Sequence, residues 1–146
     1  MPQLRIDPIT SRWIIVNTEH PKRSDEFQAE NHVKSTKTCP FCPGNEAMTP
    51  PEILAYGRRI GAKSVSSWLV RVVSNKFPAL RIEESTEKLG IGIYEKVGGF
   101  GAHEVIIENP NHDKQLADMP LEHVELVLRA YRDRCLDLRK DPRFKY

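Results

Sequence analysis

Several features that mark other protein classes are missing from this sequence of 146 residues. It has no run of about 18 apolar residues, so no membrane-spanning helix is expected. Residues 1–7 lack the apolar core of a signal peptide, which favours a cytoplasmic location. The 22 basic and 20 acidic residues give a net charge of only +2. That balance argues against nucleic acid as a partner, because nucleic-acid-binding surfaces carry a clear basic excess.

Common catalytic motifs are also missing. The glycine-rich segment at residues 98–101 lacks the lysine and spacing of a phosphate-binding loop, and we read it as a flexible turn. No Ser-His-Asp set stands out, and no two histidines are separated by a single residue. There are only three cysteines, in a chain expected to stay reduced. A metal-binding pair plus one buried thiol at Cys135 fits this count better than a disulfide framework.

The sequence does contain one strong half of a metal site. Cys39 and Cys42 have the spacing that places two sulfurs on one tetrahedral metal. Pro43 and Gly44 follow them and predict a tight turn, which we call the cysteine turn (residues 39–45). The same two residues interrupt the helix that a redox pair favours. Two buried cysteines without a metal remain the alternative.

The remaining ligands of such a site must be sought among histidines far along the chain. His112 is the preferred third ligand, because it lies on a polar turn just after a strong strand. Asp113 or a histidine beyond residue 146 would be the fourth. His103 is as well explained as a buried, hydrogen-bonded histidine. The others are assigned to the surface: His20 beside basic residues, His32 and His123.

Apolar periodicity predicts several elements. Residues 12–17, 68–73 and 103–108 are expected to be strands. Residues 49–52 look like a helix start or turn, and residues 83–88 like a solvated loop. A helix should begin at Pro120. Its expected apolar stripe consists of Leu121, Val124, Leu128, Tyr131, Cys135 and Leu138. Phe144 and Tyr146 suggest the start of a further strand, so the sequence is expected to stop inside a domain.

Anion-binding residues follow two of the predicted strands. Lys22 and Arg23 come after the first, and Asn75, Lys76 and Phe77 come after the second. Cationic groups near loop amides can bind phosphate. Phe41 and Phe77 could supply apolar walls for a base ring.

Four segments together resemble the N-terminal half of galactose-1-phosphate uridylyltransferases. They are Asp7-Pro8-Ile9-Thr10 with Arg12-Trp13-Ile14-Ile15-Val16, Cys39-Pro40-Phe41-Cys42-Pro43-Gly44-Asn45-Glu46, residues 70–80, and residues 101–112. The resemblance implies an α+β fold, with a histidine-triad-like antiparallel sheet and packed helices, as an incomplete half of a two-half enzyme. Residues 1–146 would form one N-terminal domain that stops before the catalytic half.

The resemblance also implies a reaction. The family moves a uridylyl group between UDP-glucose and galactose 1-phosphate through a covalent uridylyl-histidine. Nucleotide-sugar and sugar 1-phosphate substrates, structural zinc and a homodimeric full-length enzyme are implied as well. The nucleophile lies in a His-Pro-His motif that this sequence lacks. The 146 residues alone are therefore expected to be inactive.

Carried over by position, Cys39, Cys42 and His112 match zinc ligands of the family. Arg23 matches an arginine that contacts the nucleotide phosphates, and Phe41, Asn75 and Phe77 match residues lining the uridine pocket. Lys76 replaces an acidic residue there, which leaves the nucleotide base open. An ADP-glucose-type transferase of the same family and a non-catalytic zinc or nucleotide-binding module are the alternatives.

Overall fold

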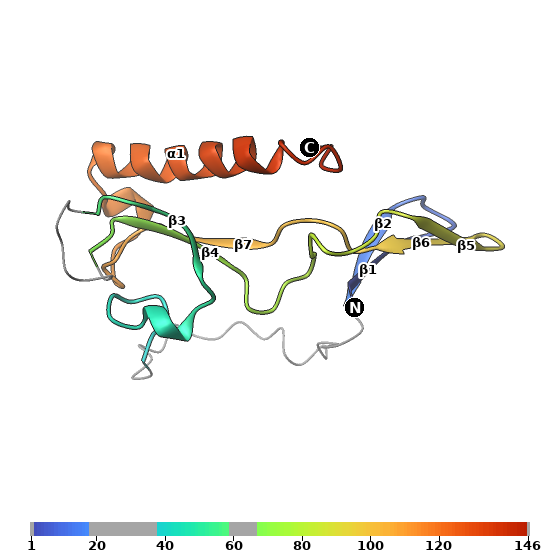
Figure 1. Ribbon diagram of the computed structural model, residues 1–146, viewed down its shortest axis with the longest axis horizontal. Helices are drawn as coiled ribbons and strands as arrows, with labels where there is room; N and C mark the ends of the chain where they lie inside the picture. Colours follow the sequence, from blue (N-terminus) through green and yellow to red (C-terminus); the bar gives the residue numbers. More distant parts are fainter. Residues whose placement is uncertain (1, 18–37, 59–66, 146) are drawn as a thin grey trace. The chain divides into compact units, whose positions relative to one another are not determined.

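A computed structural model describes residues 2–17, 38–58 and 67–145 of the chain. The chain divides into two compact units. Unit 1 comprises Met1–Thr38 and Pro78–His103, and unit 2 comprises Cys39–Phe77 and Glu104–Tyr146. Each unit contains its own antiparallel sheet (Figure 1). The described part has one α-helix, so the expected α+β class is confirmed, but as two sheets with a single helix.

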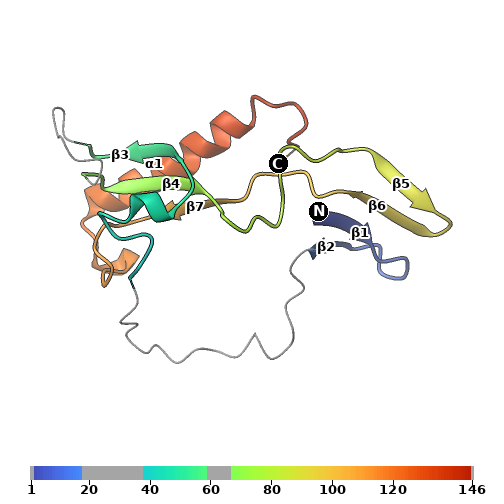
Figure 2. The same cartoon turned by 60° about the horizontal axis from the view of Figure 1, so that its bottom comes forward.

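Unit 1 is built on a four-stranded sheet with the order β2-β1-β6-β5. Its strands are β1 (Pro2–Ile6), β2 (Trp13–Asn17), β5 (Lys88–Ile91) and β6 (Tyr94–Gly98) (Figure 2). The prediction of a strand at β2 is confirmed. β1 was not predicted, although Gln3 to Ile6 alternate between polar and apolar residues. Pro2 is tolerated there because it is the first residue of the strand.

The glycines at residues 98–101 do not form the flexible turn that the sequence suggested. Gly98 is the last residue of β6, and a Cβ built on it would lie 2.4 Å from the carbonyl oxygen of Ser85. A Cβ on Gly99 would lie 2.9 Å from backbone atoms of Pro2. These glycines therefore allow backbones to approach closely. The predicted solvated loop at residues 83–88 is confirmed for most of its length, except that Glu84 is buried and Lys88 begins β5.

Unit 2 contains a three-stranded sheet with the order β3-β4-β7, covered on one face by a helix. The elements are β3 (Glu52–Tyr56), β4 (Val70–Ser74), β7 (Glu104–Ile107) and α1 (Leu121–Leu138). In Figure 1, α1 runs along the sheet. The predicted strands at β4 and β7 and the helix start after Pro120 are confirmed. No helix in the described ranges is long and apolar enough to cross a membrane.

The two faces of β4 build the core of unit 2. On the face toward α1, Val70 and Val72 pack with Val127 and Ala130, and all four are fully buried or nearly so. On the other face, Val73 packs with Trp68 and Ile107. The alternation of a strand puts successive side chains on opposite faces, so one valine-rich strand supplies both clusters.

β3 corrects the expectation of a helix start or turn at residues 49–52. It pairs with β4 as an edge strand, and the prolines at positions 50 and 51 lie just before it, where missing N–H donors do not disturb the ladder. The buried Arg71 of β4 donates to a carboxylate oxygen of Glu52 at 3.1 Å and to the Thr49 hydroxyl at 2.9 Å.

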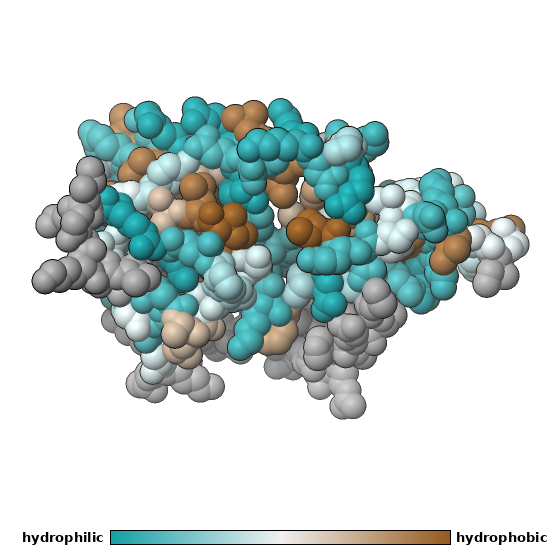
Figure 3. All heavy atoms as spheres, viewed as in Figure 1, coloured by the Kyte–Doolittle hydropathy of each residue, from teal (hydrophilic) through white to brown (hydrophobic). Residues whose placement is uncertain are grey.

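The predicted apolar stripe of α1 is not its buried face. Val127 and Ala130 are buried, whereas Leu121 is 80% exposed and Leu128 61% exposed. In Figure 3 the upper edge, over α1, is mainly hydrophilic with apolar side chains in separate patches. Polar residues help Val127 and Ala130 to orient the helix. The Arg134 guanidinium donates to both carboxylate oxygens of Glu104 in β7, each at 2.7 Å, and the Tyr56 hydroxyl of β3 donates to Asp133.

Two smaller expectations at the end of the chain are also wrong. Cys135 is exposed on α1, not buried. Phe144 follows a turn and belongs to no strand. Tyr146 lies outside the described residues.

Candidate metal centre

The cysteine turn is held by its own hydrogen bonds. The backbone N–H of Cys42 donates to the carbonyl of Cys39 at 3.3 Å, and the side-chain amide of Asn45 donates to the same carbonyl at 2.7 Å. Gly44 has a φ of +94°, in the left-handed region where glycine is favoured. The predicted tight turn after the cysteines is thus present in the structure.

His112 is carried by the turn that follows β7. The Asn109 side chain accepts from the N–H of Asn111 at 2.7 Å, and the Asn111 side chain accepts from the N–H of Asp113 at 3.1 Å. These side chains stabilise the turn as asparagines commonly do. They hold His112 next to a segment about 70 residues earlier in the chain.

The three predicted ligands meet. Nδ1 of His112 lies 3.5 Å from Sγ of Cys42, and the donor atoms of Cys39, Cys42 and His112 all lie within 4.8 Å of one another. A thiolate and an imidazole that share a tetrahedral zinc have donor atoms about 3.6 Å apart, from bond lengths of about 2.3 and 2.0–2.1 Å. Two sulfurs and one imidazole nitrogen are a donor set that suits zinc. Asp113 does not join this group in the described part of the chain.

The electrostatics of the sulfur pair depend on what else is near. Loss of water contact raises the pKa of the Cys42 thiol above its usual value, and the neighbouring Cys39 raises it further, as does Asp113. Cys42 therefore favours the protonated thiol when no cation is present. A metal cation reverses that preference, because thiolates are the metal-binding form.

A cavity of about 300 Å³ lies beside these ligands. Its lining includes the three ligand residues, Phe41 between the two cysteines, and Lys114 and Met119. Phe41 is 40% exposed, so its ring is open to a bound molecule. One predicted nucleotide-binding residue thus shares a cavity with the metal ligands.

Three other predicted nucleotide-binding residues, Asn75, Lys76 and Phe77, do not line that cavity. Asn75, Lys76 and Phe77 follow β4, and the Asn75 side chain accepts from the Phe77 N–H at 2.8 Å. Phe77 is 69% exposed. Arg23, His20 and His32 lie outside the described residues. The assignment of Arg23, Asn75, Lys76 and Phe77 to a nucleotide pocket stays a prediction.

The two remaining histidines have structural partners. Nδ1 of His103 accepts from the N–H of Ala79 at 2.9 Å, which fits the hydrogen-bonded role considered for it, although the side chain is only half-buried. His123 was expected to be solvated, but its Nε2 donates to the carbonyl of Glu108 at 2.7 Å. This bond joins the first turn of α1 to Glu108, which lies between β7 and the turn that carries His112.

Two residues near the centre were missed by sequence reasoning. Glu46, directly after the cysteine turn, accepts hydrogen bonds from the N–H of Gly44 and from the indole of Trp68. The sequence could have indicated the hydrogen bond with Gly44, because an acidic residue follows Pro-Gly-Asn directly. Nothing in the sequence linked Glu46 to a tryptophan 22 residues later.

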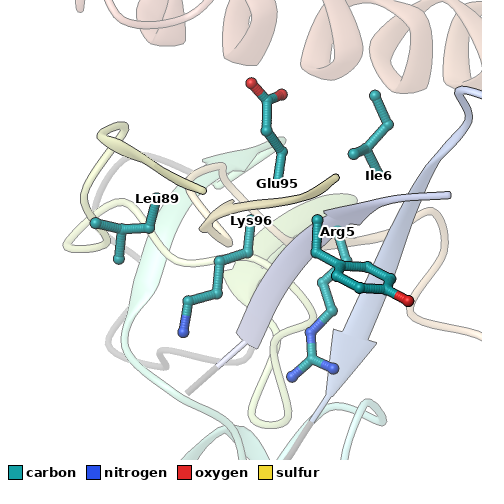
Figure 4. A pocket seen from close by; sticks show the side chains of 6 residues that line it. Arg5, Ile6, Leu89, Glu95 and Lys96 are labelled. Carbon is teal, nitrogen blue, oxygen red and sulfur yellow. The ribbon is translucent and has the colours of Figure 1, made fainter. Parts of the chain in front are cut away.

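A second cavity, of about 270 Å³, lies in unit 1 and contains none of the predicted site residues. Arg5 and Lys96 are paired across β1 and β6, and their side chains point to the same side in Figure 4. Glu95 and Ile6 point to the other side. Arg5 donates to the side chain of Gln3 at 3.0 Å.

Comparison with known protein families places the chain. The family described as "Galactose-1-phosphate uridyl transferase, N-terminal domain" matches residues 1–146. The chain belongs to this family. An ADP-glucose phosphorylase from Arabidopsis thaliana is 33% identical over 138 residues, which cover 91% of this chain and 38% of that protein. A galactose-1-phosphate uridylyltransferase from Thermotoga maritima is 26% identical over 151 positions, which cover 100% of this chain and 39% of that protein. The chain thus spans about two fifths of these family members.

Solved structures of the family share the fold. The crystal structure of the Arabidopsis thaliana ADP-glucose phosphorylase with bound ADP-glucose superposes with a TM-score of 0.53 at 29% identity, covering 94% of this chain and 38% of that one. The structure of a uridylyltransferase superposes with a TM-score of 0.63 at 24% identity, covering 95% of this chain and 36% of that one. The resemblance inferred from sequence motifs is confirmed at the level of the family.

Proposed function

We propose that this chain is the zinc-bearing, nucleotide-binding N-terminal part of a sugar-1-phosphate nucleotidyltransferase. One observation carries the proposal: Phe41 lines the cavity formed by the three converging ligands, in a chain that the family matches from end to end. A metal there would fix the scaffold, and an aromatic ring beside it would offer a surface for a base.

Zinc is proposed as a structural ion. Held by Cys39, Cys42 and His112, it would cross-link the cysteine turn to the turn after β7, and a fourth ligand would complete the tetrahedron. Metal analysis of protein purified without chelator should find about one zinc per chain. Changing Cys39 to Ser should lower both the zinc content and the melting temperature.

Cys135→Ser is the matched control for that experiment, because Cys135 is an exposed cysteine on α1. It should leave zinc content unchanged. Equal zinc in the Cys39 and Cys135 variants would contradict the site.

The proposed substrates are a nucleotide sugar and a sugar 1-phosphate. In the first form, a uridylyl group passes from UDP-glucose to galactose 1-phosphate through a uridylyl-histidine. We assign the nucleotide contacts to Arg23, Phe41, Asn75, Lys76 and Phe77. The nucleophilic step is assigned to the part of the family's length that this chain does not span. The chain alone is then expected to bind nucleotide sugar without transferring it.

An ADP-glucose-type transferase is the second candidate. The identity of 33% to an ADP-glucose phosphorylase, against 26% to a uridylyltransferase, favours it. Calorimetric titration of the zinc-loaded chain with UDP-glucose and with ADP-glucose separates the two forms. Binding of neither would favour a non-catalytic zinc module.

The full-length enzyme is proposed to be a homodimer. Apolar side chains of unit 1, among them Ile14, Leu89 and Tyr94, are about half or more exposed, which suits a surface that another chain covers. Light scattering of the full-length protein would test this, since a monomer at micromolar concentration would contradict it.

A further inference from the structure

We propose that Glu46 is a positioning residue for the metal ligands, and that its bridge to Trp68 couples metal binding to the core of unit 2. The inference rests on the proposed zinc site. It concerns how the ligands are held, which the ligand set does not determine. The Glu46 bridge is defined as the pair of hydrogen bonds that this carboxylate accepts from the Gly44 N–H and from the Trp68 indole.

Each oxygen of the Glu46 carboxylate has a different partner. Oε2 accepts from the backbone N–H of Gly44 at 2.9 Å, and Oε1 accepts from the indole N–H of Trp68 at 3.1 Å. Hydrogen bonds to an ionised acceptor are stronger than those between neutral groups. One side chain thus connects the cysteine turn to a residue outside it.

The Trp68 side chain is held in a fixed position by its surroundings. It is 3% exposed and packs against Val73 and Ile107. A closely packed side chain has little freedom to move, so a turn bonded to it inherits a fixed position. The hydrogen bonds of Asn45, by contrast, hold the turn's shape without tying it to the sheet.

The same cluster also positions the third ligand. Ile107 is the last residue of β7, and His112 follows it by five residues on the asparagine-stabilised turn. The Trp68–Ile107 contact therefore connects both parts of the ligand set, one through Glu46 and one along the chain. Loss of the Glu46 bridge should let the two sulfurs move relative to His112.

The chemistry predicts the size of the effect. Residues that orient metal ligands without touching the metal typically contribute about 10- to 100-fold in metal affinity. In Glu46→Gln, the amide retains one acceptor oxygen but presents an NH₂ group to the second donor. We expect zinc affinity to fall about tenfold, with the ligand atoms themselves unchanged.

The test uses the two tryptophans of the chain. In a Trp13→Phe background, Trp68 is the single tryptophan, and its emission is followed while the zinc-free protein is titrated with zinc. The proposal predicts an emission change that saturates at one zinc per chain. Glu46→Gln should weaken zinc binding about tenfold, measured by competition with a chromophoric chelator, and should reduce the emission change. Glu83→Gln, at an exposed glutamate of unit 1, should do neither.

A second variant separates positioning from folding. Trp68→Phe keeps an apolar ring but removes the indole N–H, so it should weaken zinc binding by a similar factor. Because both changes break one bridge, the double variant should bind zinc no more weakly than the weaker single variant. Circular dichroism of the zinc-free proteins checks that the fold is retained.

The outcomes are distinguishable. If the Trp13→Phe protein binds no zinc, the proposed metal site and this inference both fail. If it binds zinc and Glu46→Gln binds equally well, only the inference is overturned. Additive losses in the double variant would also overturn it, since independent contributions would then explain the data.

Discussion

The two units differ in how deeply they bury their tryptophan side chains. Trp68 in unit 2 is 3% exposed, whereas Trp13 in unit 1 is 43% exposed. All described hydrophobic residues in the buried core belong to unit 2. In the described part of unit 1, backbone pairing and close glycine contacts take the place of a buried apolar cluster. The comparison shows that the candidate metal ligands, Cys39, Cys42 and His112, lie in the unit with the packed core.

The largest expected effect comes from exchanging each tryptophan for alanine. Trp68→Ala should lower the free energy of unfolding by about 3–5 kcal/mol, because it leaves a cavity beside Val73 and Ile107. Trp13→Ala should cost about 1 kcal/mol, since much of its ring is already in water and Lys88 lies 5.6 Å from its centroid. Urea unfolding followed by far-UV circular dichroism measures both. Equal losses would remove the distinction between the units.

Breaking an ion pair should likewise cost more stability in unit 2 than in unit 1. Arg134 and Glu104 in unit 2 are 13% and 14% exposed and share two hydrogen bonds, so Arg134→Met should cost about 3 kcal/mol. Lys88 and Glu95 in unit 1 form an exposed pair, and Lys88→Met should cost less than about 1 kcal/mol. The same urea experiment compares them. A larger loss for Lys88→Met would contradict the burial argument.

Replacing a closely packed glycine should destabilise unit 1, whereas the preceding substitutions should destabilise unit 2 more. Gly98→Ala places a methyl group 2.4 Å from the Ser85 carbonyl oxygen and should cost about 1–3 kcal/mol. Gly90→Ala in β5 is the matched control, because its nearest neighbour would be 3.9 Å away. Thermal unfolding of both variants is the measurement. A stable Gly98→Ala protein would mean that the backbone of residue 85 moves freely.

The smallest expected effect concerns acid stability. The hydrogen bond from Tyr56, together with Arg132, lowers the pKa of Asp133 below its ordinary 3.8. The lowered pKa contributes stability above about pH 3.8 that is lost as the pH falls through the pKa of the folded state. Tyr56→Phe removes this contribution, so its free energy of unfolding should lie below that of the wild type at pH 6. The difference between the two proteins should shrink as the pH falls to about 3. Tyr94→Phe, at an exposed tyrosine, should show no such trend.

Local patterns were sufficient for several elements and for three side chains that the structure brings together at the candidate metal site. The β-branched runs predicted β2, β4 and β7, and Pro120 predicted the start of α1. The Cys39–Cys42 spacing predicted a half-site, and a polar turn after a strong strand predicted His112. These signals work because each depends on a few neighbouring residues.

Other features depend on contacts that the sequence does not display. The buried face of α1 is set by Ala130, which lets the helix approach Val70 and Val72, and by Arg134 bonded to Glu104. Leucine periodicity pointed to another face. β3 was missed because two prolines precede it, and its strand character comes from pairing with β4. The bridge from Glu46 to Trp68 depends on tertiary packing alone.

The exposed position of Cys135 on α1 has a practical consequence. With a metal on Cys39 and Cys42, Cys135 is the one thiol of the chain left open to alkylation; without it, all three are available. Thiol counting with a mild alkylating reagent thus reads metal occupancy directly. A fluorophore placed on Cys135 would label the helix at a single site while leaving the metal centre intact.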